Sequence, residues 1–155
     1  MGNTLAEIAY EASLRSLDKQ EDLLDEVRAR TGLLLAASSL AVSFLGRPAL
    51  DRAEPTIIGV ALVAFAVSTG ASIYILLPKT KRFIFSLQGS AVYEKLFEFE
   101  DDLPELHRRL ACDLDRFWDA NDKTMAKLFR AFRFAVIGLA LEVLLLLASV
   151  SGTLF

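Results

Sequence analysis

Apolar residues recur at steps of three and four along 103–132, with one step of eight across Asn121, and then become continuous. The recurring residues share one helical face: Leu103, Leu106, Leu110, Leu114, Phe117, Met125, Leu128 and Phe132. From Phe134 onward the one charged residue is Glu142, and 134–155 is long enough as a helix to cross about 30 Å of hydrocarbon. The pattern predicts one helix over 103–155 that begins in water, offers a seam to partner helices and ends as a membrane span.

The amino-terminal segment has a similar helical period with a polar gap. Thr4 is placed to cap a helix with Glu7 three residues on. Its apolar face consists of Tyr10, Leu14, Leu17, Leu24 and Val27, and Gln20 and Glu21 interrupt it. We expect an amphipathic cytosolic helix over 4–30. Binding to a membrane surface is the alternative, which seven acids against four bases disfavour.

Two further uncharged runs predict two more spans. The run 31–46 has sixteen residues, about 24 Å as a helix, which is short for a bilayer. Arginines flank it and can extend its usable length by snorkelling, so a first span is favoured over a core helix. Pro48 is expected to end that helix. The run 55–78 has twenty-four uncharged residues and predicts the second span.

Basic residues gather on one side of these spans. They precede the first span, follow the second and precede the third: Arg28, Arg30, Lys79, Lys81, Arg82, Lys127, Arg130 and Arg133. The amino terminus and 79–130 are therefore predicted to be cytosolic, with Phe155 outside. Within 79–130, 82–88 is either a strand or an interfacial segment, Gly89 and Ser90 break and cap, and a short helix follows over 91–99.

The composition agrees with a membrane protein in which apolar and charged residues lie in separate regions. Hydrophobic residues make up 54% of the chain and charged residues 24%, so apolar and charged residues must occupy separate parts of 1–155. The net charge of -3 gives no general basic character that would favour nucleic acid. We expect a single-domain, all-α membrane protein with three transmembrane helices. Extensions of the first and third spans are predicted to form a cytosolic helical stalk.

The stalk is predicted to be a parallel pair of helices. Both extensions run toward the membrane over about 40 Å, and the seam residues Leu106, Leu110, Leu114 and Phe117 are the candidates for packing. Acids concentrate over 94–122 and bases near the membrane. The basic collar either meets anionic headgroups or follows from the positive-inside rule alone.

Small and polar residues form a stripe on each predicted span. The stripes are Gly32, Ala36, Ser39 and Ser43 in the first span, Ala61, Ala64, Ser68 and Ser72 in the second, and Ala135, Gly138, Glu142, Ser149 and Gly152 in the third. Such residues let helix backbones approach closely in lipid, which explains the stripes without further function.

Glu142 is harder to explain by packing alone. A carboxylate at this depth is costly unless it is protonated, paired or hydrated, and its span supplies no basic partner there. Ser39 and Ser68 lie at a similar expected depth. Either Glu142 lines the water path of an oligomer or fixes assembly, or it is a protonated structural hydrogen-bonder. The candidate pore or assembly residues are Glu142, Ser39, Ser43, Ser68, Ser72, Gly138 and Ser149.

No catalytic, metal or cofactor site is predicted. His107 is the one histidine and Cys112 the one cysteine, and they form neither a metal site nor a nucleophile and base pair without further groups. We expect His107 to lie on a helix surface and Cys112 to be a reduced thiol. The glycines are scattered, so no loop that would cradle phosphate is indicated, and we expect a protein that is not an enzyme.

Several features of the layout occur together: Asp25, Arg28, Ala29, Gly32, Leu33 and Leu34 before a tight hairpin, a Leu-Pro-Lys exit from the second span, Tyr93 on a short helix, Asn121 on a long helix, and a glutamate in the last span. This layout resembles bacterial SLATT and Pycsar-type transmembrane effectors. Where those families commonly have a lysine before the alanine, this chain has Arg28.

The resemblance implies an inner-membrane effector of a nucleotide-signalling or anti-phage system. Such a protein would oligomerise with copies of itself and permeabilise or perturb the bilayer, and a signal or partner protein would act on its cytosolic helices. The alternative is a passive membrane scaffold that recruits a cytosolic partner through the stalk.

Overall fold

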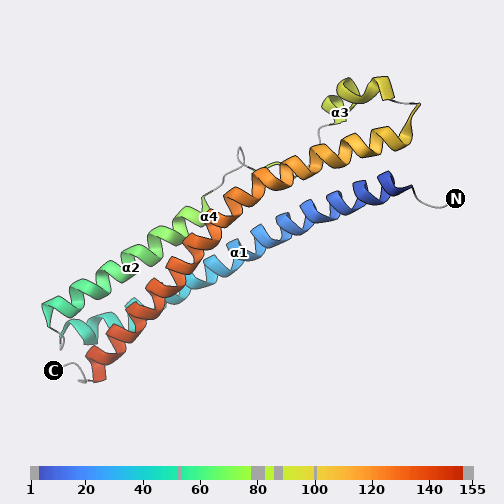
Figure 1. Ribbon diagram of the computed structural model, residues 1–155. Helices are drawn as coiled ribbons and strands as arrows, with labels where there is room; N and C mark the ends of the chain where they lie inside the picture. Colours follow the sequence, from blue (N-terminus) through green and yellow to red (C-terminus); the bar gives the residue numbers. More distant parts are fainter. Residues whose placement is uncertain (1–3, 52–53, 78–82, 86–88, 100, 152–155) are drawn as a thin grey trace. The chain divides into compact units, whose positions relative to one another are not determined.

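The computed structural model describes residues 4–51, 54–77, 83–85, 89–99 and 101–151. Its elements are α1 (Leu5–Leu50), α2 (Pro55–Leu76), α3 (Gly89–Leu96), the 3-10 turn η1 (Phe97–Phe99) and α4 (Leu103–Ser151), drawn in Figure 1. Within the described residues the regular structure is entirely helical, as the sequence predicts. The predictions for Pro78, 79–82, Gly152 and Phe155 concern residues outside the described ranges.

Contacts along the chain group into two compact units. The first, which we call the polar unit, comprises Met1–Asp25 and Lys79–Ala126. The second, which we call the apolar unit, comprises Glu26–Pro78 and Lys127–Phe155. The helices α1 and α4 each contribute to both units.

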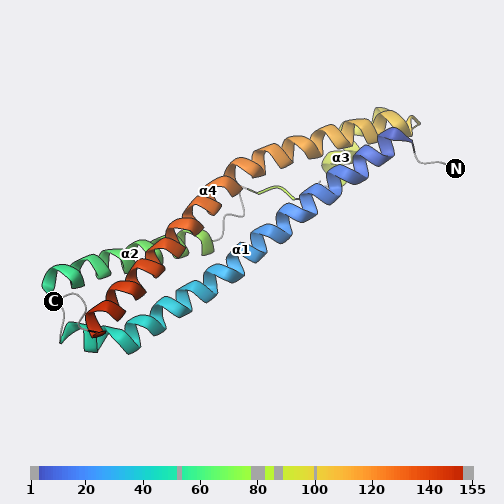
Figure 2. The ribbon, with the colours of Figure 1, turned by 60° about the horizontal axis from the view of Figure 1, so that its bottom comes forward.

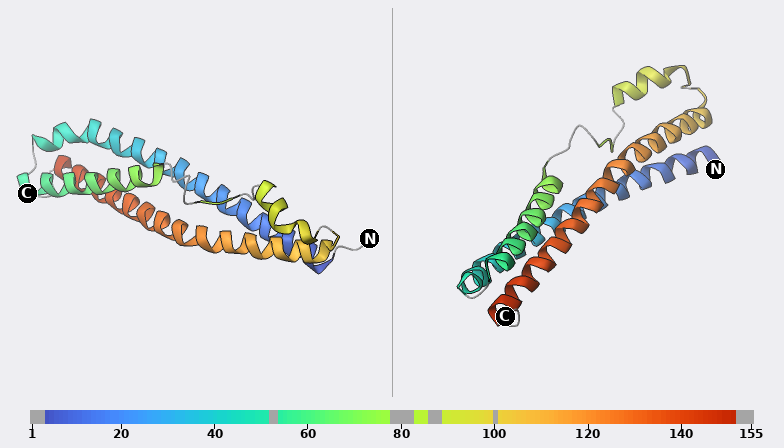
Figure 3. Two further views of the ribbon diagram at one scale, coloured as in Figure 1. Left: turned by 90° about the horizontal axis from the view of Figure 1, so that it is seen from above. Right: turned by 60° about the vertical axis from the view of Figure 1, so that its left-hand side comes forward.

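In the polar unit the starts of α1 and α4 lie side by side and parallel, as the views in Figures 1 and 2 agree. Tyr10 stacks on His107, and the Ser13 hydroxyl donates to Asp115. The two residues of each pair are separated by a similar number of positions in the sequence. This is expected when two helices run in the same direction, because both partners then advance together along the chain. Figure 3 shows α3 folded back over the start of α4, where Leu96 and Leu106 line a common pocket.

The apolar unit consists of three helices: the second half of α1, α2, and the second half of α4. Ala49, Ala61 and Leu146 form a buried cluster with one residue from each helix. Leu45, Leu145 and Val150 pack against it. Many outward-facing side chains in this unit are large and apolar, including Leu33, Leu62 and Leu144.

Burial repeats every seventh residue along both long helices. On α1 the buried positions Leu17, Leu24, Thr31 and Ser38 are at most 2% exposed. On α4 the corresponding series is Leu114, Asn121, Leu128, Ala135, Glu142 and Ser149, again at most 2% exposed. A seven-residue repeat keeps one stripe of a helix facing a parallel partner, as in coiled coils.

The helix ends depart from the sequence predictions in two places. Pro48 was expected to end α1, but the helix continues to Leu50, and the Asp51 amide still bonds the Arg47 carbonyl at 3.3 Å. Proline removes one backbone donor, and the turn that follows can remain helical. Gly89 and Ser90 were expected to precede the short helix, whereas α3 includes both.

The start of α4 follows the rules for helix capping. The Asp102 carboxylate accepts a hydrogen bond from the Glu105 amide at 3.2 Å, and Pro104 occupies the first turn, where a missing N–H costs nothing. Arg108 and Arg109 both donate to the Glu105 carboxylate. These hydrogen bonds hold the pKa of Glu105 at about 2, well below its ordinary value.

Three of the helices, α1, α2 and α4, are long and apolar enough to cross a membrane. In each, the most apolar window is largely exposed within the chain, with at most 22% of it buried. Such a surface is stable in hydrocarbon and unfavourable in water. These features indicate a multi-pass membrane protein.

Candidate functional site: a buried glutamate among three apolar helices

Close packing of α2 against α4 defines one side of the site. Gly138 leaves no room for a side chain, because an added Cβ would come within 3.0 Å of both the Ala64 carbonyl oxygen and the Ser68 Cβ. One turn away, the Ser68 hydroxyl donates to the Ala135 carbonyl at 2.9 Å. A glycine and a serine thus set the distance between the two backbones.

Other buried hydroxyls of the apolar unit bond their own helices. Thr31 donates to the Val27 carbonyl, Ser72 to that of Ser68 and Ser149 to that of Leu145, at distances of 2.7 to 2.8 Å. This local bonding satisfies the hydroxyl without a partner from another helix. It also lets these positions pack as small residues in an apolar setting.

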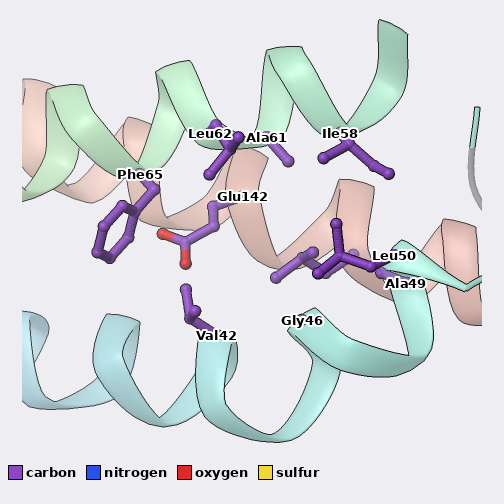
Figure 4. A pocket seen from close by; sticks show the side chains of 10 residues that line it. Val42, Gly46, Ala49, Leu50, Ile58, Ala61, Leu62, Phe65 and Glu142 are labelled. Carbon is purple, nitrogen blue, oxygen red and sulfur yellow. The ribbon is translucent and has the colours of Figure 1, made fainter. Parts of the chain in front are cut away.

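Glu142 lies on the inner face of α4, with 1% of its surface exposed. The Ser38 hydroxyl of α1 donates to Glu142 Oε2 at 2.8 Å. The other oxygen, Oε1, is buried without a hydrogen-bond partner. Figure 4 shows the carboxylate pointing between the side chains of Phe65 and Val42. One donor leaves a carboxyl group under-satisfied in apolar surroundings.

The stripe predicted for the first span faces elsewhere. Ser39 was expected to lie near Glu142, but it is exposed and donates to the Leu35 carbonyl at 2.9 Å. Ser43 is exposed as well, together with Gly32 and Ala36. The residue that reaches Glu142 is Ser38, because it continues the buried seven-residue series on α1. The stripes of α2 and α4, in contrast, point inward: Ala61, Ala64, Ser68, Ser72, Ala135, Gly138, Glu142 and Ser149 are all buried.

A small cavity adjoins Glu142. It has a volume of about 120 Å³ and is lined by residues of α1, α2 and α4. Apart from Glu142 its lining side chains are all apolar. The cavity lies entirely within the apolar unit.

The seam of the polar unit is partly as predicted. Leu110 and Leu114 are buried, at 8% and 0% exposure, while Leu106 and Phe117 are half-buried. Leu17 and Leu24 of α1 are also buried. The expected polar gap at Gln20 is instead part of the packed face, because Gln20 is 5% exposed and donates to the Trp118 carbonyl at 3.2 Å.

Asn121 is a structural residue whose role the spacing of apolar residues did not reveal. Its Oδ1 accepts from the Ile84 amide at 3.1 Å and its Nδ2 donates to the Ile84 carbonyl at 2.9 Å. This pair of bonds ties 83–85 to α4. The sequence allows either a strand or an interfacial segment over 82–88, of which the structure describes 83–85, and Ile84 in this part bonds a side chain.

The remaining reactive side chains do not converge. Among the described residues there is no group of three or more histidine, cysteine or acidic residues that would hold a metal ion. The His107 ring stacks on Tyr10 with a centroid distance of 5.4 Å, so it is half-buried rather than free at the surface. Cys112 is an exposed free thiol.

Comparisons with known proteins give no relative for this chain. No family model matches it, and no significant match is found among curated proteins or solved structures.

Proposed function

We propose that this protein is a bacterial inner-membrane effector that associates with copies of itself and permeabilises or perturbs the bilayer. Three apolar helices support the membrane location. The resemblance to SLATT and Pycsar-type effectors supports a role in anti-phage or nucleotide signalling. The distribution of bases supports a cytoplasmic amino terminus, with the polar unit on the same side.

One observation carries the proposal of self-association. Of the three stripes of small residues, those of α2 and α4 are used within the chain, whereas that of α1 is exposed. An added Cβ at Gly32 would meet nothing within 4 Å, so none of the described helices covers this position. Helices in lipid associate where small residues allow their backbones to approach. A second copy of α1 is the partner that fits this face.

A second exposed face of α1, beside the small-residue stripe, carries large apolar side chains and can serve as a control. Leu33, Leu40 and Phe44 are 57% to 72% exposed and surround Ala37 with bulky apolar side chains. This face suits acyl chains, which pack well around large side chains. The consecutive residues Ala36 and Ala37 therefore lie on two different faces of α1, Ala36 on the small-residue stripe and Ala37 among bulky side chains.

A passive scaffold remains the second candidate, and one feature of the polar unit favours it. A groove of about 670 Å³ lies between the amino-terminal parts of α1 and α4, lined by residues that include Leu5, Pro104 and Cys112. A partner protein or a soluble signal would be received at such a groove. Under the effector proposal the same groove is where a trigger binds.

Induced expression in bacteria distinguishes the two functions. The effector proposal predicts that the wild-type chain collapses the membrane potential, read with a voltage-sensitive dye. It also predicts that Ala36→Leu, which puts a bulky side chain into the stripe, removes most of this effect. Ala37→Leu, at equal membrane level, should retain it. Normal potential in cells that hold the wild-type chain in their membrane would contradict the effector and favour the scaffold.

A further inference from the structure

We propose that the apolar unit holds a segment of a phospholipid acyl chain in the cavity of about 120 Å³ between α1, α2 and α4. Figure 4 shows this cavity, with Gly46 on α1 and Ala61 on α2 among its walls. The inference requires that the apolar unit lies in a membrane. It depends neither on permeabilisation of the bilayer nor on self-association.

Small and buried residues shape the floor of the cavity. Ala49, Ala61 and Leu146 contribute one side chain from each helix and are 2%, 6% and 8% exposed. Gly46 has no side chain, and a Cβ added there would meet only Val42 Cγ1, at 3.6 Å. Within the part of the chain that the structure describes, the three helices therefore enclose a hollow that their own side chains leave open.

The surface that the cavity presents is entirely apolar, although Glu142 borders it. Glu142 Oε1 is buried, and Oε2 accepts the hydrogen bond from Ser38, so the carboxyl group offers no oxygen to an occupant. A water molecule stays in a cavity where about two to four polar groups bond it, and none is presented here. Sugars and phosphates would lose their own hydrogen bonds at such a surface. A hydrocarbon is the class of ligand that fits.

The rim of the cavity lies on helix faces that meet lipid. Val42, Leu50 and Leu62 line the cavity and are 39%, 61% and 61% exposed. They belong to α1 and α2, which are long and apolar enough to cross a membrane. Acyl chains are the hydrocarbon that surrounds such helices in a bilayer. A phospholipid is therefore the source of the occupant.

The volume of the cavity sets how much of an acyl chain enters. A dry apolar cavity of about 150 Å³ accepts benzene, so the present volume suits about four to five carbon atoms of a chain. An empty hollow forfeits van der Waals contacts along its walls, and a chain that bends into it restores them. A chain held by three helices should therefore stay longer than a chain that lies against an outward-curved part of the surface.

Photolabelling by a lipid tests this on the full chain in nanodiscs of phosphatidylcholine. A small share of the lipid carries a diazirine midway along one acyl chain, and light expels N₂ to leave a carbene that inserts into a neighbouring C–H bond. Leu62 and Val63 are a matched pair, because they are consecutive on α2 and are 61% and 64% exposed, but only Leu62 lines the cavity. Mass spectrometry should find about fivefold more label on Leu62 than on Val63.

The same pair of residues provides the results that would overturn the proposal. Equal labelling of Leu62 and Val63 would show only the contact that any lipid-facing side chain makes. Less label on Leu62 than on Val63 would show that something other than lipid covers the cavity, such as a second copy of this chain.

Matched variants locate the lipid in the cavity. Gly46→Leu should fold, because the added Cβ makes an ordinary contact with Val42, and its side chain should fill the cavity. It should lower the label on Leu62 to the level on Val63. Gly59→Leu, at a position with nothing within 4 Å and outside the cavity lining, should keep the wild-type ratio. Wild-type labelling of Leu62 in a folded Gly46→Leu would contradict the proposal.

Native mass spectrometry gives a second test if Gly46→Leu does not fold. The wild-type chain, released from detergent after purification from a phosphatidylcholine membrane, should retain a bound phospholipid. Gly46→Ala adds a single methyl group, 3.6 Å from Val42 Cγ1, and should lower the fraction of chains that retain lipid. Equal retention by the wild type and Gly46→Ala, or no retention by either, would overturn the proposal.

Discussion

The polar and apolar units are held together by different kinds of contact. In the polar unit, polar side chains bond across elements, as Ser13 does to Asp115 and Asn121 to Ile84, around fully buried leucines. In the apolar unit, the backbones approach at Gly138, and most of the described hydroxyl bonds stay within one helix.

The difference reflects the two solvents. In water, burial of a leucine is itself stabilising, and a cross-helix hydrogen bond adds direction. In lipid, leucine gains little by leaving the acyl chains, so close packing and a few polar contacts must hold the helices together. Truncation of a buried leucine should therefore lower the stability most in the polar unit. Enlargement of a small residue between two helices should lower the stability most in the apolar unit.

The largest expected effect is Leu114→Ala. Leu114 is 0% exposed in the polar unit, and its truncation leaves a cavity that should lower the free energy of unfolding by about 2 to 5 kcal/mol. Denaturant unfolding in detergent measures this change. Leu103→Ala is the control, since Leu103 is 59% exposed and its loss should change little. Equal stability of both variants would reject the packed seam.

Gly138→Ala is the converse test in the apolar unit. The new methyl group would press on the Ala64 carbonyl and on Ser68, so α2 and α4 must separate, at a cost of about 1 to 3 kcal/mol. Gly70→Ala, where an added Cβ meets nothing within 4 Å, should be neutral or slightly stabilising because alanine favours helix. The thermal midpoint in one detergent compares the two, and a tolerated Gly138→Ala would contradict the close approach.

Asn121→Ala should detach 83–85 from α4. Both backbone groups of Ile84 lose their partner, and the cost should be about 1 to 3 kcal/mol, lessened where water reaches them. Hydrogen exchange at the Ile84 amide is the direct readout and should become faster. If exchange there matched the wild type while Leu17 and Leu114 stayed packed, the proposed tie would be wrong.

The smallest effect concerns acid. Arg108 and Arg109 lower the pKa of Glu105 from 4.5 to about 2. Their hydrogen bonds to the ionised Glu105 therefore contribute fully to the stability of the fold above pH 4.5, and this contribution is lost as the pH falls toward 2. Both arginines are exposed to solvent, so the change in stability should be slight. A carboxyl titration by NMR checks the pKa, and Glu105→Gln should remove this part of the pH dependence. A midpoint near 4.5 would show that the arginines do not engage.

The helices themselves were predictable because their signals are local. Long apolar runs, the spacing of leucines and Pro104 at a helix start determine which stretches are helical, and only end residues such as Pro48 and Gly89 were misplaced. The inward directions of Leu110, Leu114 and Gly138 also follow from periodicity. These residues belong to regular stripes that repeat over many turns.

The rotation of α1 could not be read from the same stripes. Gly32, Ala36, Ser39 and Ser43 form a regular small-residue face, which suggested that this face packs inside the chain. The buried face instead continues the series Leu17, Leu24, Thr31 and Ser38, in which two members are polar. A search for seven-residue repeats of apolar residues misses this series because Thr31 and Ser38 are polar. It misses the corresponding buried series on α4 for the same reason, since that series includes Asn121 and Glu142.

Disulfide cross-linking in the membrane tests the central claim, self-association through the exposed stripe of α1, most directly. In a chain with Cys112→Ser, the account predicts that Ala36→Cys forms covalent dimers under mild oxidation, whereas Ala37→Cys stays monomeric at the same expression level. Cross-linking of Ala37→Cys with none of Ala36→Cys would contradict the account, as would the absence of dimers from both.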